Sequence, residues 1–193
     1  ENANIVLTED LILNGGSFNL GDNVNLQGNG FSIKVTGGCD FSAKASDISK
    51  STISKTYIYT ETISQNNGFG EDLGSIDIDT YNLNKVIVGN ANWWGGAADK
   101  FEIKNSVWVT PEYMELNSYV SRSDLTIQEK SENYLIQNNT IYSEYNFNFE
   151  VSAQSDKTCV FEGNKFIEPS IENVDPYLNS NRNPLFISTG NLS

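Results

Sequence analysis

The spacing of apolar residues along the first third of the chain predicts short β-strands. Apolar and polar residues alternate with a period of two, which is typical of strands with one buried face. We expect strands at residues 4–8, 10–13, 17–20, 23–27 and 30–35, because Asn- and Gly-rich turn sequences separate these stretches. No stretch of ten or more residues repeats its apolar positions with a clear helical period. The pattern therefore predicts an all-β protein.

A short motif recurs along the chain at nearly constant intervals. It consists of an apolar residue, an Asn three positions later and a second apolar residue two positions after that. From Asn67 onward the Asn positions are separated by 25, 25, 22 and 25 residues. The full motif contains Asn29, Asn117, Asn139 and Asn164, and looser copies without the first apolar residue contain Asn67 and Asn92. A helix-free repeat of this length is the size of one coil of a parallel β-helix.

In such a fold the coils stack about 4.8 Å apart, so equivalent Asn side chains form a ladder at one turn. We expect one domain over residues 1–193 with about eight coils and a polar capping segment near residues 174–193. The side chains expected to point inward are Leu26, Phe31, Ile33, Ile136, Ile141, Phe161 and Phe166. The alternative fold is a β-sandwich, which needs hairpin turns every 8 to 12 residues but no repeat.

Three segments resemble a known family. Residues 92–95 read Asn-Trp-Trp-Gly and are followed by Ile103, Val107 and Pro111. This stretch is similar to the N-W-W-G motif of bacterial surface proteins with a right-handed parallel β-helix of the pectin-lyase type. Residues 26–33 and 174–178 resemble the opening and closing patterns of the same proteins. The resemblance implies a right-handed parallel β-helix, a fold that carries enzymes, adhesins and structural modules alike.

Charge and composition exclude several classes of function. The chain has 12 Lys and Arg against 25 Asp and Glu, a formal net charge of -13 and no His. A field of this sign repels a phosphate backbone, so we expect no nucleic-acid partner. The absence of His removes every His-dependent catalytic or metal-binding arrangement. No apolar stretch approaches the ~18 residues of a membrane span, so we expect no membrane insertion.

The best candidate for acid–base chemistry is the segment Ser75-Ile-Asp-Ile-Asp-Thr-Tyr81. With the two Ile side chains pointing inward, Asp77, Asp79 and Tyr81 would share one outer face, with the carboxylates ~7 Å apart along the strand. Inverting glycosidases use a comparable separation. With Glu71 and Asp72 nearby, calcium is the one cofactor that the segment would suit. The alternative interpretation is a solvated acidic strand face without a ligand.

Aromatic residues are the second candidate site. Trp93 and Trp94 are adjacent, so within a strand only one of them faces the core. Exposed aromatic faces stack on sugar rings or on partner proteins, and Trp93 is the member we expect outside. Tyr57, Tyr59 and Trp108 would extend this outer platform. The alternative is that Trp94 fills the core and Trp93 covers a turn.

No catalytic motif of a lyase or a glycoside hydrolase of the resembled fold is recognisable. We therefore expect a non-catalytic, extracellular or cell-surface module that acts as a rigid spacer or adhesive element and associates with itself. The alternatives are a polysaccharide-active enzyme and a module that binds glycans or other surface proteins. Cys39 and Cys159 would lie about five coils apart, roughly 24 Å along the axis, which is too far for a disulfide.

Overall fold

The structure is a computed structural model that describes residues 2–60, 74–90, 101–109, 124–127, 133–142, 147–152, 158–167 and 185–190. These residues form β-strands, turns and bends without any helix, which confirms the all-β class. Every strand pair in the described part is parallel. The antiparallel hairpins that a β-sandwich requires do not occur among these pairs.

The strands belong to three sheets. Sheet A contains β1 (Ala3–Val6), β2 (Leu11–Asn14), β4 (Val24–Gln27), β5 (Ser32–Thr36), β7 (Thr52–Thr60), β9 (Asn82–Asn90), β11 (Val107–Val109), β14 (Thr140–Tyr142) and β17 (Lys165–Ile167). Sheet B contains β3 (Ser17–Leu20), β6 (Asp40–Lys44), β8 (Ser75–Asp79), β10 (Phe101–Lys104), β13 (Asn133–Gln137) and β16 (Thr158–Glu162). Sheet C contains β12 (Asp124–Ile127), β15 (Phe147–Ser152) and β18 (Leu185–Gly190).

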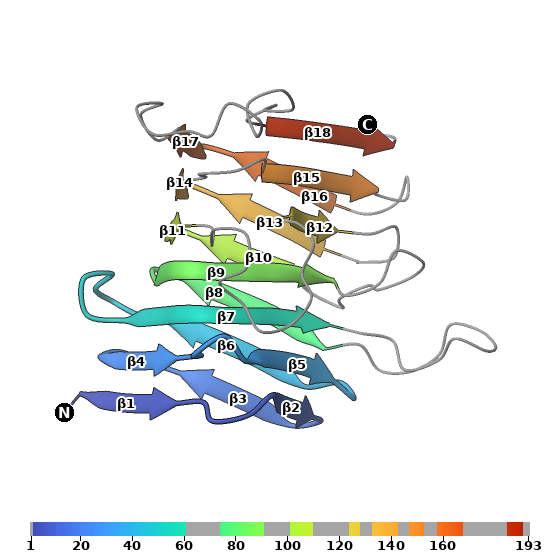
Figure 1. The fold of residues 1–193 in the computed structure, drawn as a ribbon. Coiled ribbons are helices and arrows are strands. Elements are labelled where there is room, and N and C mark those ends of the chain that lie inside the picture. Colours follow the sequence, from blue (N-terminus) through green and yellow to red (C-terminus); the bar gives the residue numbers. More distant parts are fainter. Residues whose placement is uncertain are drawn as a thin grey trace, which may run out of the picture.

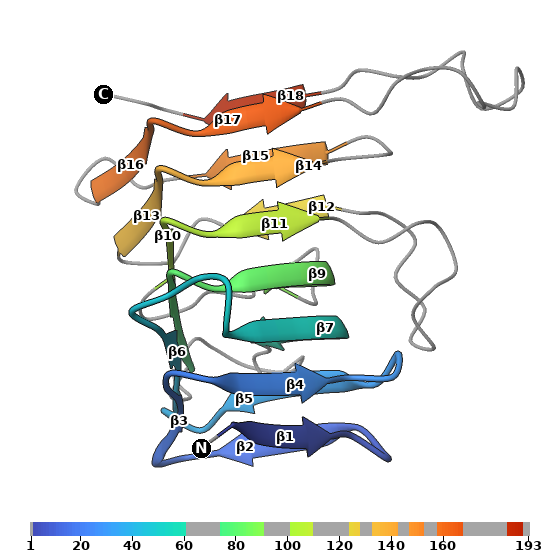
Figure 2. The ribbon, with the colours of Figure 1, turned by 90° about the vertical axis from the view of Figure 1, so that its left-hand side faces the viewer.

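The chain visits the sheets in a recurring order, and each round forms one layer on top of the last (Figures 1 and 2). The first layer is β1, β2 and β3, and the second is β4, β5 and β6, each strand pairing with its counterpart below. The main path through sheet A contains one strand for each layer, in the order β1-β4-β7-β9-β11-β14-β17. The five strands expected in the first third of the sequence are therefore confirmed as β1 to β5.

Inward side chains stack in columns and form the core. One column in sheet A runs from Ile5 through the fully buried Leu26, Ile53 and Leu83 to Trp108. Such columns remove apolar surface from water at every layer, at about 25 cal/mol per Å². They are what holds consecutive layers together.

The inward positions expected from the sequence are confirmed at four residues: Leu26, Ile33, Ile136 and Ile141 are all fully buried. Phe31 is only partly buried and packs against the edge of the core. The register pairs Phe161 with Ile136 and Phe166 with Ile141. The alternation of apolar residues therefore identified these four core residues correctly.

The turn from sheet B to sheet A is built in the same way in successive layers. Its last residue accepts a backbone hydrogen bond from the layer above, as in Asn82 N to Ser51 O at 3.0 Å and Lys165 N to Asn139 O at 2.8 Å. We call the aligned residues the corner column: Ser51, Tyr81, Ser106, Asn139 and Asn164. From one to the next they are 30, 25, 33 and 25 residues apart.

Asn139 and Asn164 form the expected ladder within this column. The Nδ2 group of Asn139 donates to Asn164 Oδ1 at 3.0 Å and to the Ile103 carbonyl at 2.8 Å, and its Oδ1 accepts from Ser106 N at 3.0 Å. Asn164 repeats this arrangement one layer further, with Oδ1 accepting from Asn139 N and Nδ2 donating to Ile136 O. Each carboxamide thus bridges two backbone groups of the neighbouring layer.

Asn29 is not aligned with this column. Asn29 lies between β4 and β5, both in sheet A, so its place outside the corner column corrects our expectation. It donates to the Leu7 carbonyl at 3.1 Å instead. Asn67, Asn92 and Asn117 lie outside the described residues. The register aligns Ser106, rather than an Asn, with Asn139, because segments of unequal length connect the layers.

Thr80 occupies a corner position that favours other residues. The residue before each corner residue from Tyr81 onward has a positive φ: 58° at Thr80, 50° at Asn105, 57° at Asn138 and 65° at Gly163. A β-branched residue is strained in this left-handed region, which Asn and Gly tolerate. We expect Thr80→Asn to raise the free energy of unfolding by about 1 kcal/mol. Urea unfolding measures this, and Thr80→Ala, which retains the unfavourable Cβ without the Asn amide, should give little gain.

The two cysteines lie in different layers of sheet B. Cys39 is buried directly before β6, and Cys159 belongs to β16. Four strand spacings separate β6 from β16, about 19 Å rather than the five spacings expected. Burial, together with the nearby charge of Asp40, raises the pKa of the Cys39 thiol. Cys39 is a free buried thiol.

Candidate functional site on the outer face of sheet B

The two carboxylates singled out from the sequence lie on the outer face of sheet B. In β8, Ile76 and Ile78 are fully buried, as expected, so Asp77 and Asp79 point the other way. Register pairs Asp77 with Glu102 of β10 and Asp79 with Lys104, also of β10. The strand geometry therefore places alternating charged residues of adjacent layers side by side.

Tyr81 does not belong to this face, which corrects the expectation from the sequence. Its side chain is fully buried, and its hydroxyl donates to the Gly21 carbonyl at 2.6 Å. The strict alternation ends at Thr80, whose φ of 58° reverses the direction of the chain at the corner. Burial is the main cause that raises the pKa of Tyr81 to about 12.

Lysine residues contact both carboxylates. Lys44 Nζ lies 2.6 Å from Asp77 Oδ2, and Lys104 Nζ lies 3.7 Å from Asp79 Oδ2 and 2.9 Å from Glu102 Oε2. We call these five residues the charge cluster. The side chain of Asp77 is 10% exposed and that of Lys44 51%, so the carboxylate is the more desolvated partner. Removal of a carboxylate from water costs free energy, and a cation in contact with it offsets part of this cost.

Asp79 is also held by its own corner. Its Oδ1 accepts from Asn105 Nδ2 and from Thr80 Oγ1, both at 2.9 Å. Next to it, burial opposes the charge on Lys104, but the hydrogen bond and charge of Glu102 and the charges of Asp77 and Asp79 outweigh burial and raise the pKa of Lys104. Lys104 is therefore protonated at neutral pH and cannot act as a general base there.

Three members of the charge cluster were not singled out from the sequence: Lys44, Glu102 and Lys104. They are 25 to 35 residues away from the aspartates that they approach in register, so no local motif contains them. A signal was nevertheless present. The segment Phe101-Glu-Ile-Lys104 alternates apolar and charged residues in the same way as Ile76-Asp-Ile-Asp79.

The calcium site considered from the sequence involves residues beyond the charge cluster. Glu71 and Asp72, the further ligands considered for calcium, lie outside the described residues. Within the described ranges no group of three or more Asp, Glu, Cys or His side chains is placed to hold a metal ion. The same ranges contain no helix long and apolar enough to cross a membrane.

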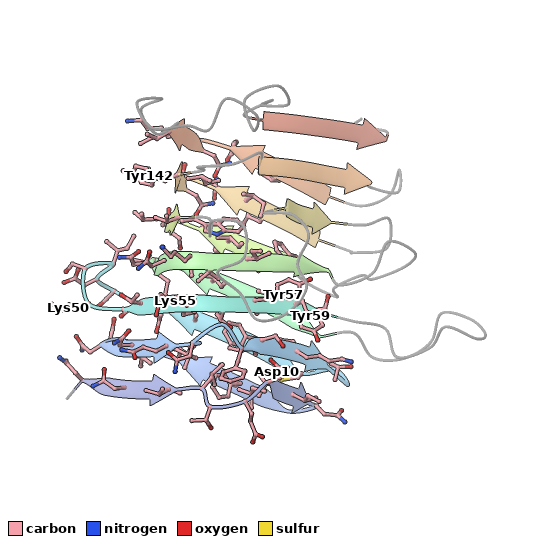
Figure 3. The ribbon with its side chains drawn as sticks, in the orientation of Figure 1. Asp10, Lys50, Lys55, Tyr57, Tyr59 and Tyr142 are labelled. Atoms are coloured by element: carbon pink, nitrogen blue, oxygen red, sulfur yellow. The ribbon has the colours of Figure 1, made fainter. Side chains whose placement is uncertain are left out.

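The aromatic platform is present in part. Trp93, its central expected member, and Trp94 lie outside the described residues. Trp108 is buried and its Nε1 donates to the Val86 carbonyl at 2.7 Å, so it is a core residue. Tyr57 and Tyr59 lie together near one end of β7 (Figure 3). Their rings stack with centroids 4.6 Å apart and an interplanar angle of 16°.

Comparisons of the chain with protein-family models, with curated proteins and with solved structures find no match. The function must therefore be argued from the residues described above.

Proposed function

We propose that the chain is a right-handed parallel β-helix that serves as a non-catalytic structural module of an extracellular surface or fibre-forming protein. The layered parallel strands, the inward columns and the corner column support this fold. The layers follow each other at 25 to 33 residues in the corner column, and the described residues form seven strands along the main path of sheet A, against about eight coils expected from the sequence. A stack of this kind suits a spacer because its layers add up along one axis.

The charge cluster is the observation that carries the non-catalytic assignment. Asp77 and Asp79 are the best carboxylate pair for glycoside chemistry, and a lysine ammonium group contacts each of them. Each carboxylate of the pair therefore already has a cationic partner within the protein. Along the register Lys44, Asp79 and Lys104 alternate in charge from layer to layer, whereas Asp77 lies opposite the like-charged Glu102.

Incubation with acidic polysaccharides tests this assignment. Unsaturated and reducing ends would be followed for the wild type and for the double variant Asp77→Asn/Asp79→Asn. We expect neither protein to form products above the buffer control. Sustained turnover by the wild type that the double variant lacks would overturn the proposal in favour of a polysaccharide-active enzyme.

The tyrosine pair favours glycan binding as a second candidate function. Tyr57 and Tyr59 point away from the core on β7, and Lys34 of β5 is in register with Tyr59. Aromatic rings offer apolar faces to sugars, and an ammonium group binds hydroxyl or carboxylate oxygens. Titration with oligosaccharides, followed by calorimetry, should show binding that Tyr59→Ala removes. Tyr142→Ala, at an exposed tyrosine on β14, is the matched control and should bind as the wild type does.

A further inference from the structure

One outer face of the stack consists of uncharged residues in the part of the chain that the structure describes. It belongs to the main path of sheet A, whose strands lie above one another (Figure 2). In β4, β7 and β9 two side chains point away from the core, one on each side of a fully buried residue. We call these six residues the uncharged face: Asn25, Gln27, Thr52, Ser54, Asn82 and Asn84. The strands β1, β11 and β14 continue it without a charged residue.

Charge distinguishes this face from other outer faces of the stack. The outer face of sheet B carries the charge cluster, and Lys34 lies on the outer side of β5. Lys55 and Lys85 only border the uncharged face, because their positive φ values of 49° and 60° mark the turn of the chain out of it. The whole chain has a net charge of -13. Two copies therefore repel each other over most of their surface, whereas the uncharged face sets no like charges against each other.

The uncharged face is a regular array of hydrogen-bonding groups. Its side chains are about 4.8 Å apart between layers and roughly 7 Å apart along each strand. None of its six residues is buried. Asn25 Nδ2 donates to Asn4 Oδ1 of the layer below at 3.3 Å, so carboxamides of adjacent layers bond to each other. A carboxamide carries two N–H donors and two acceptor lone pairs, so it can also bond to an identical group of another molecule.

We infer that the uncharged face binds the same face of a second copy of this chain, sheet against sheet. The inference rests on the stacked fold of the proposed function. Sheets of equal strand spacing interdigitate short side chains at a distance of about 10 Å, and ladders of Asn and Gln add to such contacts. Because both copies use the same surface, the contact is two-fold symmetric and closes at a dimer. The two stacks lie side by side in it.

The size of the face predicts a weak dimer. The six layers from β1 to β14 extend it over roughly 24 Å, and each strand contributes only two outward side chains. Such a strip is smaller than the ~800 Å² that each partner of a standard interface buries. We therefore expect a dissociation constant between about 1 μM and 1 mM.

Sedimentation equilibrium of the full chain, at concentrations up to about 1 mM, tests the inference. We expect the mass to rise from 21.4 kDa toward twice this value. Salt should strengthen the association, because it screens the repulsion between the charged parts of the two copies. A wild type that stays monomeric at every concentration and salt level would overturn the inference. If that monomer is retained on cellulose and the Asn84 variants described next are not, the face binds a neutral glycan instead.

Charge changes at Asn84 test the surface itself. Asn84 is exposed near the middle of the six layers, so Asn84→Lys and Asn84→Glu should leave the fold intact, which circular dichroism verifies. Each variant sets like charges against each other in the dimer and should weaken association at least about tenfold. The matched controls are Asn19→Lys and Asn19→Glu, at an exposed Asn on the outer face of sheet B. They change the net charge equally and should associate as the wild type does.

A mixture of the two Asn84 variants tests the two-fold symmetry. Lys of one copy then meets Glu of the other, so the mixture should associate more tightly than either variant alone. If the mixture is no tighter, or if the Asn84 variants associate as well as the Asn19 controls, the uncharged face is not the contact. Polysaccharide turnover is measured separately, so an enzymatic activity would overturn the proposed function and leave this result standing.

Discussion

Asn139→Ala should lower the free energy of unfolding by about 3 kcal/mol. The Asn139 residue is 1% exposed, and its carboxamide bonds to Ser106 N, Ile103 O and Asn164 Oδ1. Alanine would leave these buried groups without partners, and each unsatisfied group costs about 1–3 kcal/mol before relaxation. Urea unfolding followed by circular dichroism measures the loss.

Two further variants test whether the loss of stability comes from the hydrogen bonds of the ladder or from the loss of any side-chain amide. Asn139→Asp retains an acceptor for Ser106 N but loses both side-chain donors, so it should also be destabilising. Asn25→Ala removes the weaker hydrogen bond to Asn4 Oδ1, 3.3 Å long and exposed, and should change stability little. If Asn139→Ala is no more destabilising than Asn25→Ala, the corner column does not hold the layers together.

Tyr81→Phe should be destabilising at neutral pH and nearly neutral at pH 11. At pH 8 the variant loses the hydrogen bond to Gly21 O and leaves that carbonyl without it, at a cost of about 1–2 kcal/mol. The folded protein holds the pKa of Tyr81 at about 12, against an ordinary value of 10.0. The unfolded chain therefore loses this proton first as the pH rises.

The raised pKa of Tyr81 determines the direction in which stability changes with pH. The contribution of neutral Tyr81 is complete below pH 10 and decreases as the pH rises toward 12. At pH 11 the wild type should have lost about 1.4 kcal/mol relative to the variant, so the difference between them closes. Urea unfolding of both proteins at pH 8 and pH 11 tests this, and a difference that stays constant would show that Tyr81 ionises normally.

The strands and the inward residues of the first layers could be predicted from the sequence because their signals are local. Alternation at Leu26 and Ile33 reports which face is buried, and Gly and Asn mark the turns between strands. Only two of the five residues of the charge cluster could be predicted from the sequence. Asp77 and Asp79 belong to one alternating segment, but Lys44 and Lys104 reach them only through the pairing of β6, β8 and β10.

The sequence by itself determined the all-β class, the recurrence of similar strands along the chain and the inward positions that form the apolar columns. These features depend on the alternation of apolar and polar residues within each strand. The tertiary structure alone decided the alignment between layers. It aligned Ser106, rather than an Asn, with Asn139, and it turned Tyr81 into the core after the left-handed Thr80. The physical reason is that layers are aligned by hydrogen bonds between distant strands, while the segments that connect them vary in length. A regular spacing of Asn residues therefore does not establish which of them lie above one another.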